Sequence, residues 1–264
     1  MKFLRLFFPL LFCGASLVAC HEKKTNANVH IRMEDLAGWD RKEYSLSSRK
    51  IREAVEQSRT RRPRMYADSY VSDYYASQAP FLWITRSGID ERADTLLGRL
   101  RQEVQAGIPE SAFHIAEIQE NLARIRTLDF DKRHDINTVY GETEYLLTQA
   151  LARYACGQRF GYVRPETALN RLEKTDTTEN APFRQLYAIR TEHADKAFFH
   201  QVLAAQKDGD MGRFLQSLHP DNALYHSFVR AYRQAQSPER RRKAAANIER
   251  CRWRTPRPEG KYVW

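Results

Sequence analysis

Apolar residues recur every three or four positions along most of the chain, which is the period of an amphipathic helix. The clearest run begins at residue 89 and stops at Gly107. A last helix is expected from Ser237 to about Arg252, because serine caps helices well and Pro238 suits the first helical position. Similar runs predict further helices over about 47–58, 111–127, 135–156, 183–206, 210–218 and 221–235. The pattern therefore predicts an all-α fold.

Two stretches depart from the helical pattern. Pro165 and the polar run 174–180 mark a loop. After Pro256 and Pro258, residues 260–264 look like the opening of a β-strand, and the helices offer it no sheet. We therefore expect a multi-helix domain with the start of a truncated β-strand at its C-terminus.

The first 19 residues have the pattern of a secretory signal. Lys2 and Arg5 precede an apolar stretch that reaches about residue 18 and is short for a membrane span. It ends in Leu-Val-Ala-Cys20, which resembles the bacterial lipobox, whose cysteine carries lipid after cleavage. The alternative is an ordinary signal peptide with a chance cysteine. We expect a signal peptide over 1–19, lipid attachment at Cys20 and a polar tether over 20–40.

Composition and charge narrow the classes of partner. The 264 residues are 42% hydrophobic, which suits a globular domain, and 11 glycines and 10 prolines are few for a many-turned β-sandwich. A net charge of +10 suits nucleic acid, an anionic membrane or an anionic wall polymer. Export would exclude nucleic acid as a partner. It also leaves Cys156 and Cys251 in an oxidising compartment, either paired or free.

Several stretches between residues 70 and 264 resemble the scaffold region of exported YkuD-type L,D-transpeptidases. They are Tyr74-Tyr75, Phe81-Leu82-Trp83, Gly88-Ile89, residues 106–109, Phe113-His114-Ile115, residues 151–155, residues 161–165, residues 247–253 and residues 261–264. In that family the stretch matching 247–253 leads into the first strand of the catalytic domain. The resemblance implies a helical scaffold domain over 41–252 and, over 253–264, a linker into an absent catalytic domain.

The family cross-links peptidoglycan by acyl transfer through a cysteine thioester. This chemistry needs a thiolate, a histidine base and an oxyanion hole, which the family places in and around a Ser-x-Gly-Cys motif. The sequence lacks that motif, and neither Cys156 nor Cys251 matches its nucleophile. We therefore expect a chain that is not an enzyme on its own, with no catalytic residue, no metal and no cofactor.

The leading hypothesis is a lipid-anchored scaffold segment of an L,D-transpeptidase-like protein that acts in peptidoglycan cross-linking. It would be exported to the bacterial cell envelope, face the periplasm, and touch the membrane through Cys20. Its partners would be a catalytic L,D-transpeptidase domain and peptidoglycan. The missing domain would pack on an exposed apolar patch formed by Trp253, Tyr262, Val263 and Trp264.

Two other hypotheses remain open. The chain could be a stand-alone lipoprotein that binds peptidoglycan or an envelope partner through the tyrosine-rich segment 66–75 and the basic helix near Arg240, although core packing and a solvated face explain these features more simply. A helical lytic glycosidase would need a glutamic acid with a raised pKa in an apolar cleft. The candidates for that acid are Glu117, Glu120, Glu142 and Glu144. His193 and His200 lie seven apart, and surface or packing roles suit them better than metal binding.

Overall fold

The computed structural model describes residues 44–62, 65–164, 171–174, 177–178, 183–185 and 191–254. The predicted signal segment, Cys20 and the predicted tether lie outside the described residues. So do Tyr262, Val263 and Trp264, together with the predicted strand opening that contains them.

Helices dominate the described part of the chain, which confirms the all-α prediction. The helices are α2 (Ser48–Arg61), α3 (Asp68–Ala76), α4 (Arg92–Val104), α5 (Ile115–Thr127), α6 (Ile136–Phe160), α8 (Lys196–Lys207), α9 (Met211–Ser217), α10 (Ala223–Gln234) and α11 (Pro238–Arg252), with a 3₁₀ turn η2 (Glu110–Ala112). The strands form two short antiparallel pairs: β1 (Ile84–Thr85) with β2 (Gly88–Ile89), and β3 (Arg171–Lys174) with β4 (Phe183–Gln185).

Two predicted helices begin later than expected. The helix predicted over 183–206 is wrong in its first part, because residues 183–185 pair as strand β4 and α8 starts only at Lys196. Asp195 caps α8 by accepting a hydrogen bond from the Phe198 N–H at 2.7 Å, so a neighbouring side chain determines where this helix begins. The run from residue 89 likewise becomes helical only at Arg92, since Ile89 belongs to strand β2.

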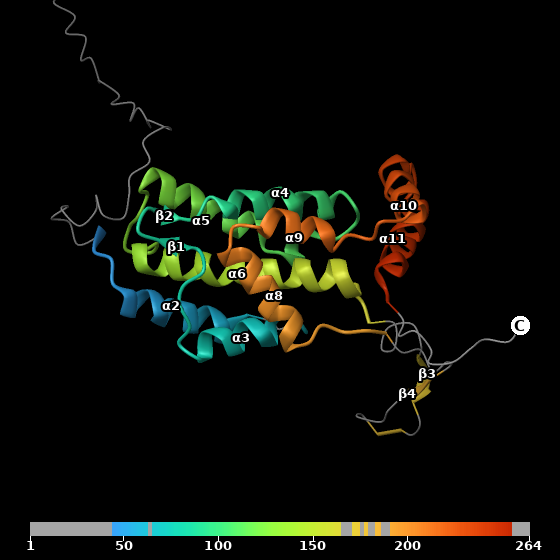
Figure 1. Cartoon of the computed structure of the whole chain (residues 1–264), viewed down its shortest axis with the longest axis horizontal. Helices are drawn as coiled ribbons and strands as arrows, with labels where there is room; N and C mark the ends of the chain where they lie inside the picture. The colour runs from blue at the N-terminus through green and yellow to red at the C-terminus, as the bar shows by residue number, and fades with distance from the viewer. Residues whose placement is uncertain are drawn as a thin grey trace, which may run out of the picture.

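Helix α6 forms the centre of the molecule. Figure 1 shows α2 and α3 along one side of it, α4 and α5 along the other, and α8 and α9 crossing in front. Most residues of α6 are buried on all sides, so it lacks the polar face of a surface helix. The α10–α11 hairpin stands across one end of this bundle, opposite the end where α2 begins (Figure 1).

Polar side chains inside the bundle join α6 to its neighbours. The Glu144 carboxylate accepts hydrogen bonds from the N–H groups of residues 82, 83 and 84 at 2.5, 3.0 and 3.1 Å, and from the Tyr75 hydroxyl at 2.6 Å. Arg153 pairs with the buried carboxylate of Asp68 at 2.7 Å. These contacts fix α3 and the loop before β1 against α6, because a buried charge is stable only when paired.

No helix in the described ranges combines the length and the apolar character that crossing a bilayer requires.

Candidate functional site

A buried ion-pair cluster holds the end of α11 against the bundle. The Arg252 guanidinium contacts Glu103 of α4 at 2.7 Å and Glu249 of α11 at 3.3 Å. The rings of Tyr162 and Tyr225 flank it at 5.1 and 5.7 Å from their centroids. Burial raises the pKa of Glu103, and Arg252 opposes that rise. The cluster therefore depends on the cation to keep a carboxylate inside the protein.

The same end of α11 also forms hydrogen bonds with the segment that follows α6. The Val163 N–H donates to Glu249 Oε1 at 2.6 Å, and the Trp253 Nε1–H donates to the Val163 carbonyl at 3.0 Å. Both backbone groups of Val163 are thus satisfied by one helix end that is 86 residues further along the chain. The contact sets the direction in which the chain leaves α6.

Two glycines allow the end of α11 and the segment after α6 to pack closely together. Gly161 has φ +91°, and a Cβ there would lie 2.7 Å from Trp253 and 2.8 Å from Glu249. At Gly157 a Cβ would lie 2.1 Å from the Tyr162 ring. Any larger residue would push α11 or Tyr162 away, so the close packing requires glycine at both positions.

A third segment completes the site. The Glu192 N–H donates to the Arg254 carbonyl at 2.8 Å, which brings residues 191–192 beside the end of α11. We call the set formed by residues 161–164, 191–192 and 249–254 the α6–α11 junction. It holds three stretches of backbone in fixed relative positions. Within it, the Glu249 carboxylate is occupied by Arg252 and by the Val163 N–H.

Of the four aromatic and apolar residues predicted to contact a neighbouring domain, the structure describes Trp253. Its side chain is half-buried in the junction, and Val163 beside it is 43% exposed. Tyr262, Val263 and Trp264 lie outside the described residues, so the predicted apolar patch stays a prediction.

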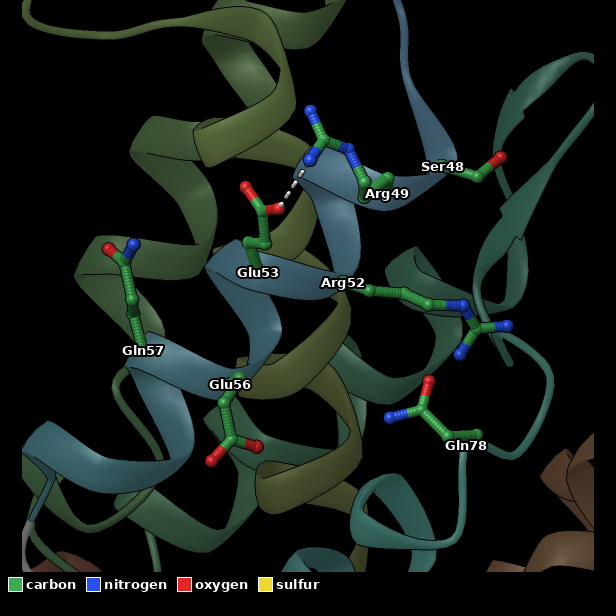
Figure 2. Close-up of a pocket in the computed structure, with 7 residues that line it drawn as sticks. All are labelled: Ser48, Arg49, Arg52, Glu53, Glu56, Gln57 and Gln78. Carbon is green, nitrogen blue, oxygen red and sulfur yellow. Dashed lines mark ion pairs between the residues drawn. The ribbon is translucent and has the colours of Figure 1, made fainter.

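A shallow hollow of about 700 Å³ lies on the outer face of α2, away from this junction. Figure 2 shows Arg52 pointing toward Gln78, and Arg49 paired with Glu53 at 3.6 Å. The Arg52 Nη1 also donates to the Ala79 carbonyl at 3.0 Å. The lining is open, and its two arginines are matched by two glutamates, so it offers no single sign of charge to a ligand.

The two described cysteines are free thiols. Burial raises the pKa of Cys156 to about 12, and the pKa of the partly exposed Cys251 is also raised by burial. Both thiols are therefore protonated at neutral pH and poor nucleophiles. His193 and His200 are exposed, and no cluster of metal-ligating side chains occurs among the described residues.

Glu144 is the buried glutamate that a glycosidase would need, but its surroundings are wrong for catalysis. Burial raises its pKa, while hydrogen bonds from Tyr75 and from three backbone N–H groups oppose the rise. The residue is completely buried and does not line the α2 hollow. Glu117 pairs with Arg62 and Glu120 pairs with Arg124, so both carboxylates serve ion pairs within the chain.

The tyrosine hydroxyls of segment 66–75 bond within the chain, although Tyr66 is 44% exposed. The hydroxyls of Tyr66 and Tyr70 donate to the Ala194 carbonyl at 2.6 and 2.7 Å. Tyr74 donates to the Pro80 carbonyl at 2.7 Å, and Tyr75 is bonded to Glu144. These contacts attach α3 to the loop before α8 and to α6.

The sequence analysis missed the role of Glu103. A signal was present, because Glu103 follows Leu96 and Leu100 on the apolar face of α4, where an acid needs a buried cation. Its partner, Arg252, was part of the motif noted at 247–253, but the pairing across the chain could not be read from spacing.

A family model described as Scaffold domain matches residues 69–231, which run from α3 into α10. Neither the curated proteins nor the solved structures contain a match to this chain.

Proposed function

The chain belongs to the Scaffold domain family, and we propose that it is a lipid-anchored scaffold that supports a catalytic domain of the L,D-transpeptidase type at the bacterial cell envelope. The peptidoglycan setting, the lipid anchor and the catalytic partner are our inference from the resemblance of its motifs to that enzyme family. In this proposal the chain itself performs no chemistry and positions the domain that does.

The observation that carries the proposal is the meeting of two motifs at the α6–α11 junction. Residues 161–165 and residues 247–253 are two of the stretches that resemble the family, and in the family the second one leads into the catalytic domain. Val163 is bonded to both Glu249 and Trp253, so the two stretches act as one support. A rigid support is what a linker needs if it is to hold a second domain at a defined angle.

The state of the thiols supports a role without catalysis. A thioester mechanism needs a thiolate with an adjacent base. Burial keeps Cys156 protonated, and the pKa of Cys251 is raised as well. In this proposal the nucleophile comes from the supported domain.

The decisive experiment is a muropeptide analysis in a bacterium that carries the gene. Deleting the gene should reduce the L,D-type cross-links, and the wild-type gene should restore them. Trp253→Ala should fail to restore them while the protein accumulates normally, because the clamp on Val163 is lost. Trp253→Phe keeps most of the ring packing and should restore them in part. Unchanged cross-links after deletion would reject the proposed function.

The lipid anchor has its own test. Metabolic labelling with an alkyne fatty acid should mark the wild-type protein and leave Cys20→Ser unlabelled. Cys13→Ser is the matched control, since Cys13 lies within the predicted signal segment and should not affect labelling. Equal labelling of wild type and Cys20→Ser would remove the anchor from the proposal.

A further inference from the structure

The tip of the α10–α11 hairpin carries an exposed group of cations. The two helices are joined by residues 235–237, and the cations lie within about two turns of this connection. We call Arg230, Arg233, Arg240 and Arg242 the tip cluster, and all four are exposed. Residues 223–252 hold eight lysines and arginines against two acidic residues, so the hairpin carries a net charge of +6 of the chain's +10.

The members of the tip cluster have no carboxylate partners in the described part of the chain. Several arginines of the bundle do have them: Arg59 with Glu56, Arg62 with Glu117, Arg92 with Asp90, Arg124 with Glu120, Arg126 with Asp94 and Arg153 with Asp68. Other bundle arginines, such as Arg86 and Arg133, are exposed without an ion pair among the described residues, so the tip cluster is distinguished by four such cations at one end of a hairpin. Within the described ranges, no acidic side chain pairs with a member of the tip cluster. The nearest acid, Glu239, is bonded to Lys243 at 2.7 Å.

Folding gives no reason for these arginines. Arg240 and Arg242 lie in the first turns of α11, where the positive end of the helix dipole favours acidic residues. The cations also repel one another, since they share one end of the hairpin. Ala244 and Ile248 are among the buried residues of α11, whereas Arg240 and Arg242 are exposed. The tip cluster is therefore open to an anionic partner from outside the hairpin.

We propose that the tip cluster binds the carboxylates of peptidoglycan stem peptides, an inference that takes its envelope setting from the proposed function. Arginine pairs with carboxylates in a bidentate geometry, so a polymer that repeats such groups complements an exposed arginine cluster. An amphipathic helix that docks on a bilayer would also present large apolar side chains among its cations. The one strongly exposed apolar residue of the hairpin, Leu224, lies at the other end of α10.

The position of the hairpin agrees with this partner. The predicted tether joins the described structure at the start of α2, and the hairpin stands at the opposite end of the bundle (Figure 1). Helix α6, with 25 residues, spans about 37 Å between these ends. If Cys20 anchors the chain, the tip cluster belongs to the end of the bundle far from the point where the predicted tether joins it.

Co-sedimentation of the purified full chain with isolated sacculi tests the inference. The sacculi are first treated with hydrofluoric acid, which removes polymers attached through phosphate. The test variant is the triple change Arg233→Gln, Arg240→Gln and Arg242→Gln. The matched control removes three exposed cations from the β1–β2 turn and the α5–α6 connection, at the far end of the bundle: Arg86→Gln, Lys132→Gln and Arg133→Gln.

We expect the tip variant to bind sacculi roughly ten- to a hundredfold more weakly than wild type, and the control to stay within about threefold. Amidation of the sacculus carboxylates should abolish wild-type binding. Equal losses in both variants, or undiminished binding to amidated sacculi, would overturn the inference. Vesicles containing phosphatidylglycerol that bind through the tip cluster, when sacculi do not, would reassign it to the membrane.

This assay is independent of the muropeptide analysis. If the tip variant loses sacculus binding but gene deletion leaves cross-links unchanged, the inference stands and the proposed scaffold function falls. If deletion removes cross-links but the tip variant binds sacculi normally, the proposed scaffold function stands and the inference about the tip cluster falls.

Discussion

Replacing Arg252 with methionine should remove the cation from the buried cluster while nearly preserving its volume. The Glu103 side chain is 2% exposed and would lose its partner at 2.7 Å, and Glu249 would lose one at 3.3 Å. Breaking a buried pair by deleting one member destabilises proteins by about 3–5 kcal/mol. For a chain of this size that corresponds to a fall in Tm of about 6–20 °C.

The loss of stability caused by Arg252→Met should also depend on pH. Burial already raises the pKa of Glu103, and removing Arg252 raises it further. A carboxyl whose folded pKa lies above its unfolded value favours the unfolded state as pH rises through the folded pKa. The deficit of Arg252→Met relative to wild type should therefore be larger at pH 8 than at pH 5.

Urea unfolding followed by circular dichroism measures this deficit at each pH. Arg250→Met is the matched control, because Arg250 is exposed on the same helix and its side chain contacts Asn247 at 3.5 Å; its effect should stay within about 0.5 kcal/mol. Adding Glu103→Gln to Arg252→Met should recover part of the stability, since no buried charge remains unpaired at that position. A deficit under about 1 kcal/mol, or one that shrinks with rising pH, would refute the reasoning.

Three further predictions concern single positions. Gly161→Ala should destabilise the fold by about 2–3 kcal/mol in the same urea assay because of its φ of +91° and the contact with α11; Gly98→Ala, with open space around its Cβ, should stabilise it by about 0.5–1 kcal/mol. Burial and nearby cations lower the pKa of His219 to about 4, so wild type should lose about 1–2 kcal/mol, after allowing for solvent screening, as pH falls from about 6.5 to 4. His219→Gln should not show this component, and identical pH profiles would contradict the assignment. In native protein, maleimide should label Cys251 well before the buried Cys156, and equal labelling rates would contradict the burial.

Helix positions were largely determined by local sequence. Ser237 caps α11 by accepting from the Arg240 N–H, and Pro238 occupies the first turn, as predicted from these residues alone. The apolar spacing over 111–127 likewise predicted α5, whose buried residues are those that recur at three and four. Such features depend on neighbours within one or two turns, so they can be predicted from a short stretch of sequence.

The strand at 183–185 depends on a partner strand and not on its own residues alone. Its apolar and polar residues suit a helix as well as a strand, and the pairing with residues 171–174 decides between them. The burial of α6 on every side is similar, because polar residues such as Glu144 and Arg153 can lie in a core only when distant partners satisfy them.

The candidate site itself was decided by tertiary structure. The sequence supplied two motifs, but only folding brought Val163 to Glu249 and Arg252 to Glu103, pairs that lie 86 and 149 residues apart. The glycines at 157 and 161 acquire their importance from the same approach, since their missing side chains matter only when Tyr162 and Trp253 fill the space. Local composition determined which segments are helices, and long-range burial of charge and close packing determined how they meet.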